Sequence, residues 1–104
     1  MDRVGFRMRL LPGQAAEYRR RHAAVWPEML DALRAAGARK YSIFLGGYDL
    51  FGYLEVEDFA RFRERMAAAE VNDRWQAGMT ALIDPLTDPE TGFHRRLEEV
   101  FHLE

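Results

Sequence analysis

The chain has 104 residues, 48% hydrophobic and 31% charged, which suits one domain with a real core. Its formal net charge of −2 lacks the basic excess of nucleic-acid binders, so nucleic acid is not an expected partner. The absence of cysteine excludes disulfides and thiolate chemistry, and no apolar run could span a membrane, so we expect a cytoplasmic protein.

The first third of the chain predicts a strand followed by a broken helix. Apolar residues at the even positions from Val4 to Leu10 alternate with arginine or glycine, which indicates a half-buried strand. The composition from Gln14 to Ala36 favours helix, and Gly37 is a suitable cap for its end. Pro27 lies inside this stretch and lacks a backbone donor, so we expect a break near Val25–Trp26 with Pro27 opening a second helical segment.

The middle of the chain predicts a hairpin and further helices. Strands at Tyr41–Leu45 and Leu50–Val56 flank a Gly46-Gly47 turn. Asp58 is placed to cap the next helix. Apolar residues then recur at helical spacing at Phe59, Phe62, Met66, Val71, Trp75, Met79 and Leu82.

The end of the chain predicts a loop and a last strand. Two Asp-Pro pairs between Asp84 and Gly92 indicate the loop, and the alternating residues Glu99–Leu103 indicate the strand. The resulting order is β-α-β-β-α-β, that of a ferredoxin-like α+β domain spanning residues 1–104. Its antiparallel four-stranded sheet carries helices on one face only. The other face must meet water or a second copy of the chain, so we expect a homodimer.

Three aromatic or titratable residues stand at four-residue spacing in the first helical stretch. Tyr18, His22 and Trp26 would therefore lie close to one face. A histidine exchanges protons near neutral pH, and together with a phenol and an indole it could form a polar-aromatic pocket wall. The alternative is that the two large aromatic residues belong to the core and the histidine is structural.

The segment Asn72–Gln76 is a second candidate, since an amide beside the indole of Trp75 suits carbohydrate recognition. Its alternative is a helix anchored in the core by Trp75. Arg7 and Arg9 of the first strand could bind an anion on the uncovered face of the sheet, but we expect them to pair with acidic residues. Further motifs are lacking: His94 and His102 share no ligand spacing with His22, and no nucleotide-binding or serine-nucleophile motif is present. We therefore expect neither a metal nor a cofactor.

Several of these motifs together resemble the L-rhamnose mutarotase family. They are the run from Glu17 to His22, the sequence Val25-Trp26-Pro27-Glu28, Gly37-Ala38, Tyr41-Ser42-Ile43, Arg74-Trp75 with Met79, and Glu99 to Leu103. The resemblance covers essentially the whole chain. It implies a dimeric α/β barrel that interconverts the α and β anomers of the monosaccharide L-rhamnose.

The resemblance also implies roles for individual residues. His22 matches the catalytic acid of the family, while Tyr18 and Tyr41 match its sugar-contacting tyrosines. Trp75 matches the first of two adjacent tryptophans that line the sugar pocket, and Gln76 stands where the second is expected. This amide could form hydrogen bonds that a tryptophan does not and so alter which 6-deoxy sugar fits, or it could have no effect if a neighbour fills the space.

The expected reaction suits this set of residues. Mutarotation needs proton transfer to and from a sugar but no redox cofactor, metal or covalent intermediate, and acid–base catalysis by one histidine typically gives about 10²–10⁴-fold. Three alternatives stay open: a mutarotase for L-fucose or another 6-deoxy sugar, a small dimeric monooxygenase, and a non-catalytic sugar-binding module.

Overall fold

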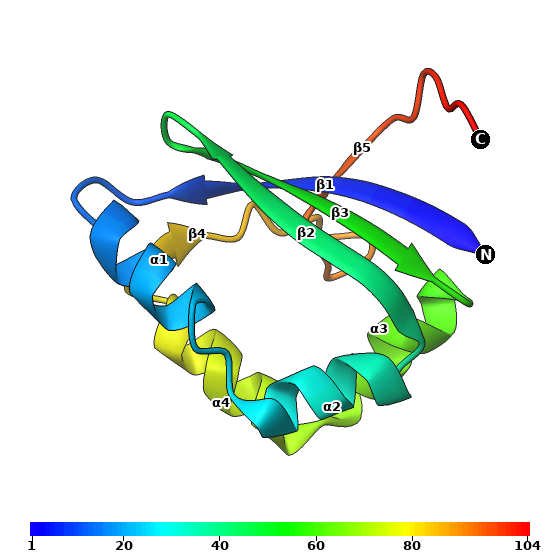
Figure 1. Cartoon of the computed structure of the whole chain (residues 1–104), viewed down its shortest axis with the longest axis horizontal. Helices are drawn as coiled ribbons and strands as arrows, with labels where there is room; N and C mark the ends of the chain where they lie inside the picture. Colours follow the sequence, from blue (N-terminus) through cyan, green and yellow to red (C-terminus); the bar gives the residue numbers. More distant parts are fainter.

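The computed structural model describes all 104 residues and shows one sheet with four helices. The strands are β1 (Asp2–Leu10), β2 (Ala38–Gly46), β3 (Asp49–Val56), β4 (Ile83–Asp84) and β5 (Arg95–Leu97). The helices are α1 (Ala15–His22), α2 (Pro27–Ala35), α3 (Phe59–Ala68) and α4 (Glu70–Met79). The strands form one layer and the four helices lie together on one side of it (Figure 1). None of the helices has the length and apolarity needed to cross a membrane.

The sheet has the antiparallel ferredoxin-like order that the sequence predicts, β2-β3-β1-β4. One difference lies at the β4 edge, where two short strands share the free side of β1. Strand β4 pairs with Arg9 and Leu10, and β5 pairs with residues from Gly5 to Arg7. Because β5 pairs along the same edge of β1, the residues just before β5, Phe93 and His94, pack against Phe6 in the middle of β1.

The predicted alternation along β1 is confirmed and builds the centre of the core. Val4, Phe6, Met8 and Leu10 are all buried on the face that the helices cover. Burying a side chain of this size typically stabilises the fold by about 1.5–3 kcal/mol. Gly52 of β3 lies opposite Phe6, and a Cβ atom at this position would overlap the Phe6 ring. The glycine therefore leaves space for Phe6, which also packs beside the cavity described below.

The predicted break before Pro27 is also confirmed. Helix α1 ends at His22, and Trp26 has the extended backbone favoured before proline, with φ −56° and ψ 132°. Pro27 then occupies the first turn of α2, where its missing N–H leaves no helical bond unmade. The expectation that Trp26 continues the helical face of Tyr18 and His22 is wrong, because α1 ends before it.

Two predicted helix ends are confirmed. The Asp58 carboxylate accepts a hydrogen bond of 2.9 Å from the backbone N–H of Arg61 and so caps α3. Gly37 has φ +104°, a conformation that favours glycine, and it closes α2. Leu82 departs from its prediction, since α4 stops at Met79 and Leu82 is buried in the turn that follows.

The last predicted strand, Glu99–Leu103, is wrong. Regular pairing ends with β5, and residues 98–104 form no helix or strand. A strand needs a neighbour, and the chain leaves the edge of β1 after Leu97, where only the side-chain ion pair between Arg3 and Glu99 (2.8 Å) still ties it down. This tail, red in Figure 1, leaves the sheet on the side away from the helices. Its apolar side chains Val100, Phe101 and Leu103 are highly exposed.

Candidate active site

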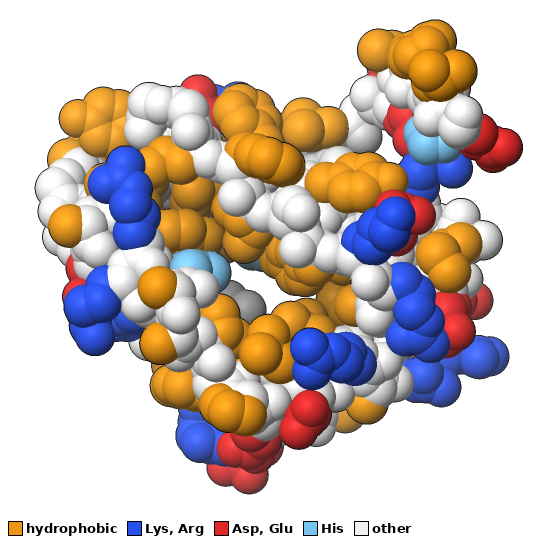
Figure 2. Space-filling view, viewed as in Figure 1, with side chains coloured by type: hydrophobic (Ala, Val, Ile, Leu, Met, Phe, Trp, Pro, Cys, Tyr) orange, Lys and Arg blue, Asp and Glu red, His pale blue; other side chains and the backbone are white.

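A large cavity lies between the sheet and the helices. It has a volume of about 1040 Å³, at the upper limit of the 300–1,000 Å³ typical of small-molecule sites. Figure 2 shows it as a hollow lined mainly by hydrophobic atoms. The cavity brings together the five residues that the family resemblance assigns to the site, which are Tyr18, His22, Tyr41, Trp75 and Gln76, whereas Trp26 of the predicted pocket wall does not line it. The lining is mostly apolar with a few polar groups, as in sites that bind small polar ligands.

Helix α1 presents Tyr18 and His22 as a stacked pair. Their ring centroids are 4.1 Å apart with an angle of 25° between the planes. His22 Nδ1 lies 3.0 Å from the backbone oxygen of Tyr18. Since a carbonyl oxygen can only accept, Nδ1 carries a proton, and in the neutral ring the lone pair is on Nε2. Nε2 has no partner within the chain, so His22 can give a proton to a ligand or take one from it.

Two aromatic residues of the cavity wall, Tyr18 and Trp75, carry polar groups that have no hydrogen-bond partner. Tyr18 and Trp75 are 6% and 7% exposed, yet neither the phenol nor the indole N–H forms a hydrogen bond within the chain. The only fully buried side-chain nitrogen or oxygen without a partner is Arg63 Nε, so the Tyr18 hydroxyl and the Trp75 N–H both keep some accessible surface. Burial raises the pKa of Tyr18 to about 12, and it also raises the pKa of Tyr41. Both phenols therefore keep their protons and can hold hydroxyl groups of a ligand.

Trp75 of the cavity wall packs against a second tryptophan, Trp26, which does not itself line the cavity. Trp75 of α4 meets His22 edge to face at 5.4 Å and Trp26 at 5.0 Å. Trp26 is 40% exposed and lies under the guanidinium of Arg74, which also pairs with Glu28 of α2. Trp75 thus has both roles that the sequence left open, since it is a core anchor and a wall of the site.

Gln76 follows Trp75 and is exposed at the rim of the cavity. Its Nε2 donates a 3.2 Å hydrogen bond to Asn72 Oδ1, one turn earlier on α4. The carbonyl oxygen of the Gln76 amide has no partner within the chain. It is therefore available to accept a hydrogen bond from a ligand.

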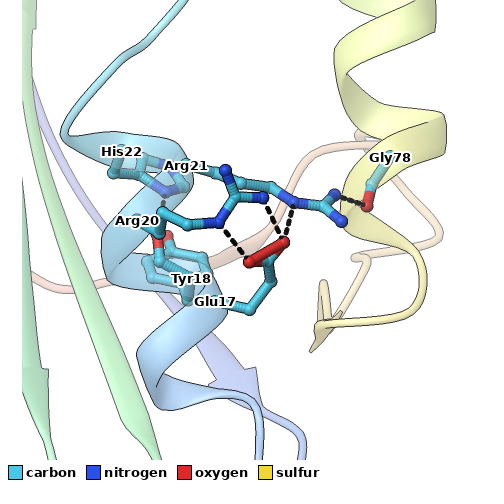
Figure 3. A network of polar contacts seen from close by, with 6 residues as sticks. All are labelled: Glu17, Tyr18, Arg20, Arg21, His22 and Gly78. Carbon is cyan, nitrogen blue, oxygen red and sulfur yellow. Dashed lines mark hydrogen bonds and ion pairs between the residues drawn. The ribbon is translucent and has the colours of Figure 1, made fainter.

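An ion-pair network fixes α1 against α4. Glu17 accepts hydrogen bonds from Arg20 and Arg21, and Arg21 Nη1 donates a 2.5 Å hydrogen bond to the backbone oxygen of Gly78 (Figure 3). The hydrogen bonds from the two guanidinium groups lower the pKa of Glu17 to about 2. The network holds the helix that carries His22 at a fixed place beside the helix that carries Trp75.

We expect Glu17→Gln to lower Tm at neutral pH and to flatten the acid side of the stability curve. The Glu17 pKa is lower in the folded chain than the usual value near 4.3. Its stabilising effect is therefore complete above that value and is lost as the pH falls toward 2. Thermal unfolding of both proteins from pH 7 to pH 2 checks this. A Tm difference that does not shrink in acid would contradict it.

Two residues of the cavity carry no signal that the sequence analysis detected, His94 and Arg63. His94 follows the loop after β4, and Arg63 lies on α3 above the ring of Phe59, 5.0 Å from its centroid. His94 is brought to the cavity by the preceding loop and by the pairing of β5 with β1. Neither feature produces a periodic pattern of apolar residues in the sequence around residue 94. Its position just before β5 could have indicated it only if that pairing had been known.

The other polar candidates of the sequence lie outside the cavity. Arg7 is on the uncovered face of the sheet and pairs with Asp49 at 2.7 Å, as expected. No ion pair forms at Arg9. His102 lies in the exposed C-terminal tail.

Comparisons with known proteins agree with this geometry. The sequence model of the L-rhamnose mutarotase family matches residues 3–103. An L-rhamnose mutarotase from Burkholderia orbicola is 45% identical over the full length of both chains, and one from Enterococcus faecalis is 42% identical over 99% of this chain and 100% of its own. The crystal structure of an L-rhamnose mutarotase from Formosa agariphila superposes with a TM-score of 0.81, at 30% identity and full coverage of both chains.

The fold and the matches together define the class: this is an isomerase that acts on carbohydrates. The chain belongs to the L-rhamnose mutarotase family.

Proposed function

We propose that the chain interconverts the α and β anomers of L-rhamnose, with His22 as the general acid. The observation that carries this proposal is the stacked Tyr18–His22 pair in the cavity wall, in which Nδ1 of His22 is held by a backbone carbonyl and Nε2 has no partner within the chain. The names of the relatives supply the sugar, since they are L-rhamnose mutarotases.

The reaction follows from proton transfer alone. A base takes the proton of the anomeric hydroxyl while His22 gives a proton to the ring oxygen, and the bond between C1 and the ring oxygen breaks. The free aldehyde turns about its bond to C2, and the reverse steps close the ring on the other face of the carbonyl. Tyr18 and Tyr41 hold sugar hydroxyls, and Trp75 packs against the apolar side of the ring.

The direct test is proton NMR magnetisation transfer between the two anomeric signals of L-rhamnose at equilibrium. We expect the exchange rate to rise in proportion to protein concentration. A protein that saturates with the sugar without speeding exchange would be a binding module, and that result would refute the proposed activity.

Gln76 favours a second candidate substrate, L-fucose, because it places an amide where the family resemblance expects a tryptophan. L-Rhamnose and L-fucose differ only in the orientation of their hydroxyls, to which the free amide oxygen could bind. We expect Gln76→Trp to change the ratio of kcat/KM for the two sugars about tenfold in favour of L-rhamnose. NMR exchange with each sugar checks this, and an unchanged ratio would remove Gln76 from the specificity of the site.

We also propose that two chains associate through the uncovered face of the sheet. Phe44 of β2 and Phe51 of β3 are paired neighbours on this face and are 63% and 40% exposed, and Leu97 of β5 is 39% exposed. Contiguous exposed apolar side chains of this kind are typical of interfaces.

We expect Phe51→Glu to shift the protein from dimer to monomer in sedimentation equilibrium. Ala60→Glu, at an exposed position of α3, is the matched control and should leave the dimer intact. A wild-type protein that is monomeric at high concentration would contradict the proposed association.

A further inference from the structure

The reaction proposed above needs a base as well as an acid, and the cavity wall narrows the choice. None of the side chains that line the cavity is a carboxylate. Its titratable groups are Tyr18, Arg19 and His22 of α1, Tyr41 of β2, Arg63 of α3, and His94. The arginines stay protonated and the tyrosines have raised pKa values, so only the two histidines can accept a proton near neutral pH.

His94 is held as firmly as His22. Its Nδ1 lies 2.8 Å from the backbone oxygen of Pro85, and its ring stacks on Phe6 at 5.2 Å and 20°. Phe93 packs against the same ring at 4.8 Å. Because the Pro85 oxygen can only accept, Nδ1 carries the proton and the lone pair of the neutral ring is on Nε2. This is the arrangement of His22, repeated on a different wall.

The reactive nitrogen of His94 is free. Nε2 forms no hydrogen bond within the chain. It also keeps some accessible surface, since the only fully buried side-chain nitrogen or oxygen without a partner is Arg63 Nε. Burial lowers the pKa of His94, although the hydrogen bond to Pro85 opposes this. The cationic Arg63 lines the same cavity. A neutral imidazole with an open lone pair is what a general base at neutral pH requires.

Resting on the proposed mutarotation, we infer that His94 is the general base: its Nε2 takes the proton of the anomeric hydroxyl while His22 protonates the ring oxygen. The step starts with His22 as the imidazolium, protonated at both ring nitrogens, and with His94 neutral. Ring opening leaves His94 protonated and His22 neutral. When the ring closes on the other face, His94 returns its proton to the carbonyl oxygen as the C1–O bond to the ring forms. His22 takes the proton from the attacking hydroxyl. Both histidines thereby regain their starting states.

The test compares His94→Asn with the wild type and with His102→Asn. Asparagine keeps a donor that can reach the Pro85 oxygen but lacks the basic nitrogen, and His102 lies in the exposed tail outside the cavity. We expect His94→Asn to lower kcat for anomer exchange on the order of 10²-fold with little change in KM. The fall of kcat/KM at acid pH that marks protonation of the base should disappear. His102→Asn should behave as the wild type.

The outcomes separate this inference from the proposed function. Full activity of His94→Asn, with activity lost in His22→Ala, overturns the role of His94 and leaves the mutarotase intact. No exchange by the wild type overturns both.

A measurement on the wild type keeps the inference testable if His94→Asn fails to fold. In a histidine-selective ¹⁵N–¹H spectrum, His94 Nε2 should be unprotonated at pH 7 and should shift on saturation with L-rhamnose. The inference is overturned if His94 Nε2 is protonated at pH 7, or if its resonance does not shift on saturation with L-rhamnose.

Discussion

Replacing His22 by Ala is expected to lower the rate of anomer exchange by about 10²–10⁴-fold, the range typical of a lost general acid. The loss should appear in kcat, because Tyr18, Tyr41 and Trp75 still form the walls that hold the sugar. The fold should persist, since His22 is only partly buried and its Nδ1 bond to Tyr18 lies within one turn of α1. NMR exchange rates and circular dichroism spectra of both proteins check these expectations.

Tyr18→Phe is the matched control for this prediction. It keeps the ring that stacks on His22 and removes only the phenol oxygen. We expect a raised KM with a much smaller loss of kcat. If His22→Ala exchanges the anomers at the wild-type rate with a native spectrum, the acid role of His22 is refuted.

Replacing Trp75 by Ala is expected to destabilise the fold by about 3–5 kcal/mol, the usual loss for a buried tryptophan. Trp75 is 7% exposed and joins α4 to His22 and Trp26. Small domains have a total stability of about 5–15 kcal/mol, so this loss would be a large share of the free energy of unfolding. Urea unfolding followed by circular dichroism measures the change.

Trp26→Ala provides the comparison within the same chain. Trp26 is 40% exposed and lies outside the helices, so its loss removes less buried surface and should cost clearly less than that of Trp75. Equal losses for the two tryptophans would show that burial at Trp75 is not what stabilises the region.

Local patterns along the sequence predicted most of the fold because each has a local physical cause. The alternation in β1 reflects one buried face, the break before Pro27 reflects a missing donor, and the Asp58 cap satisfies a free N–H. Strands β4 and β5 were missed because two or three residues carry no period. Their existence depends on the edge of β1, which is distant in sequence.

The residues of the candidate site also fall into those placed by local spacing, which the sequence can predict, and those placed by long-range contacts, which it cannot. Tyr18 and His22 are one helical turn apart, so their stacking follows from spacing within α1. Trp26 was misplaced on that face because the helix stops four residues earlier. His94 reaches the cavity only through the pairing of β5 with β1 and the packing of its ring on Phe6, both long-range contacts.

The most direct test of whether the reaction takes place in this cavity uses the resonances of the chain's three histidines. A histidine-selective ¹⁵N–¹H spectrum is recorded during titration with L-rhamnose, in the same samples in which anomer exchange is measured. The His22 resonances should shift with a midpoint equal to the KM for exchange, while those of His102 in the exposed tail stay fixed. Exchange that saturates without any shift at His22 would show that the reaction takes place elsewhere on the molecule and would contradict the assignment of this cavity.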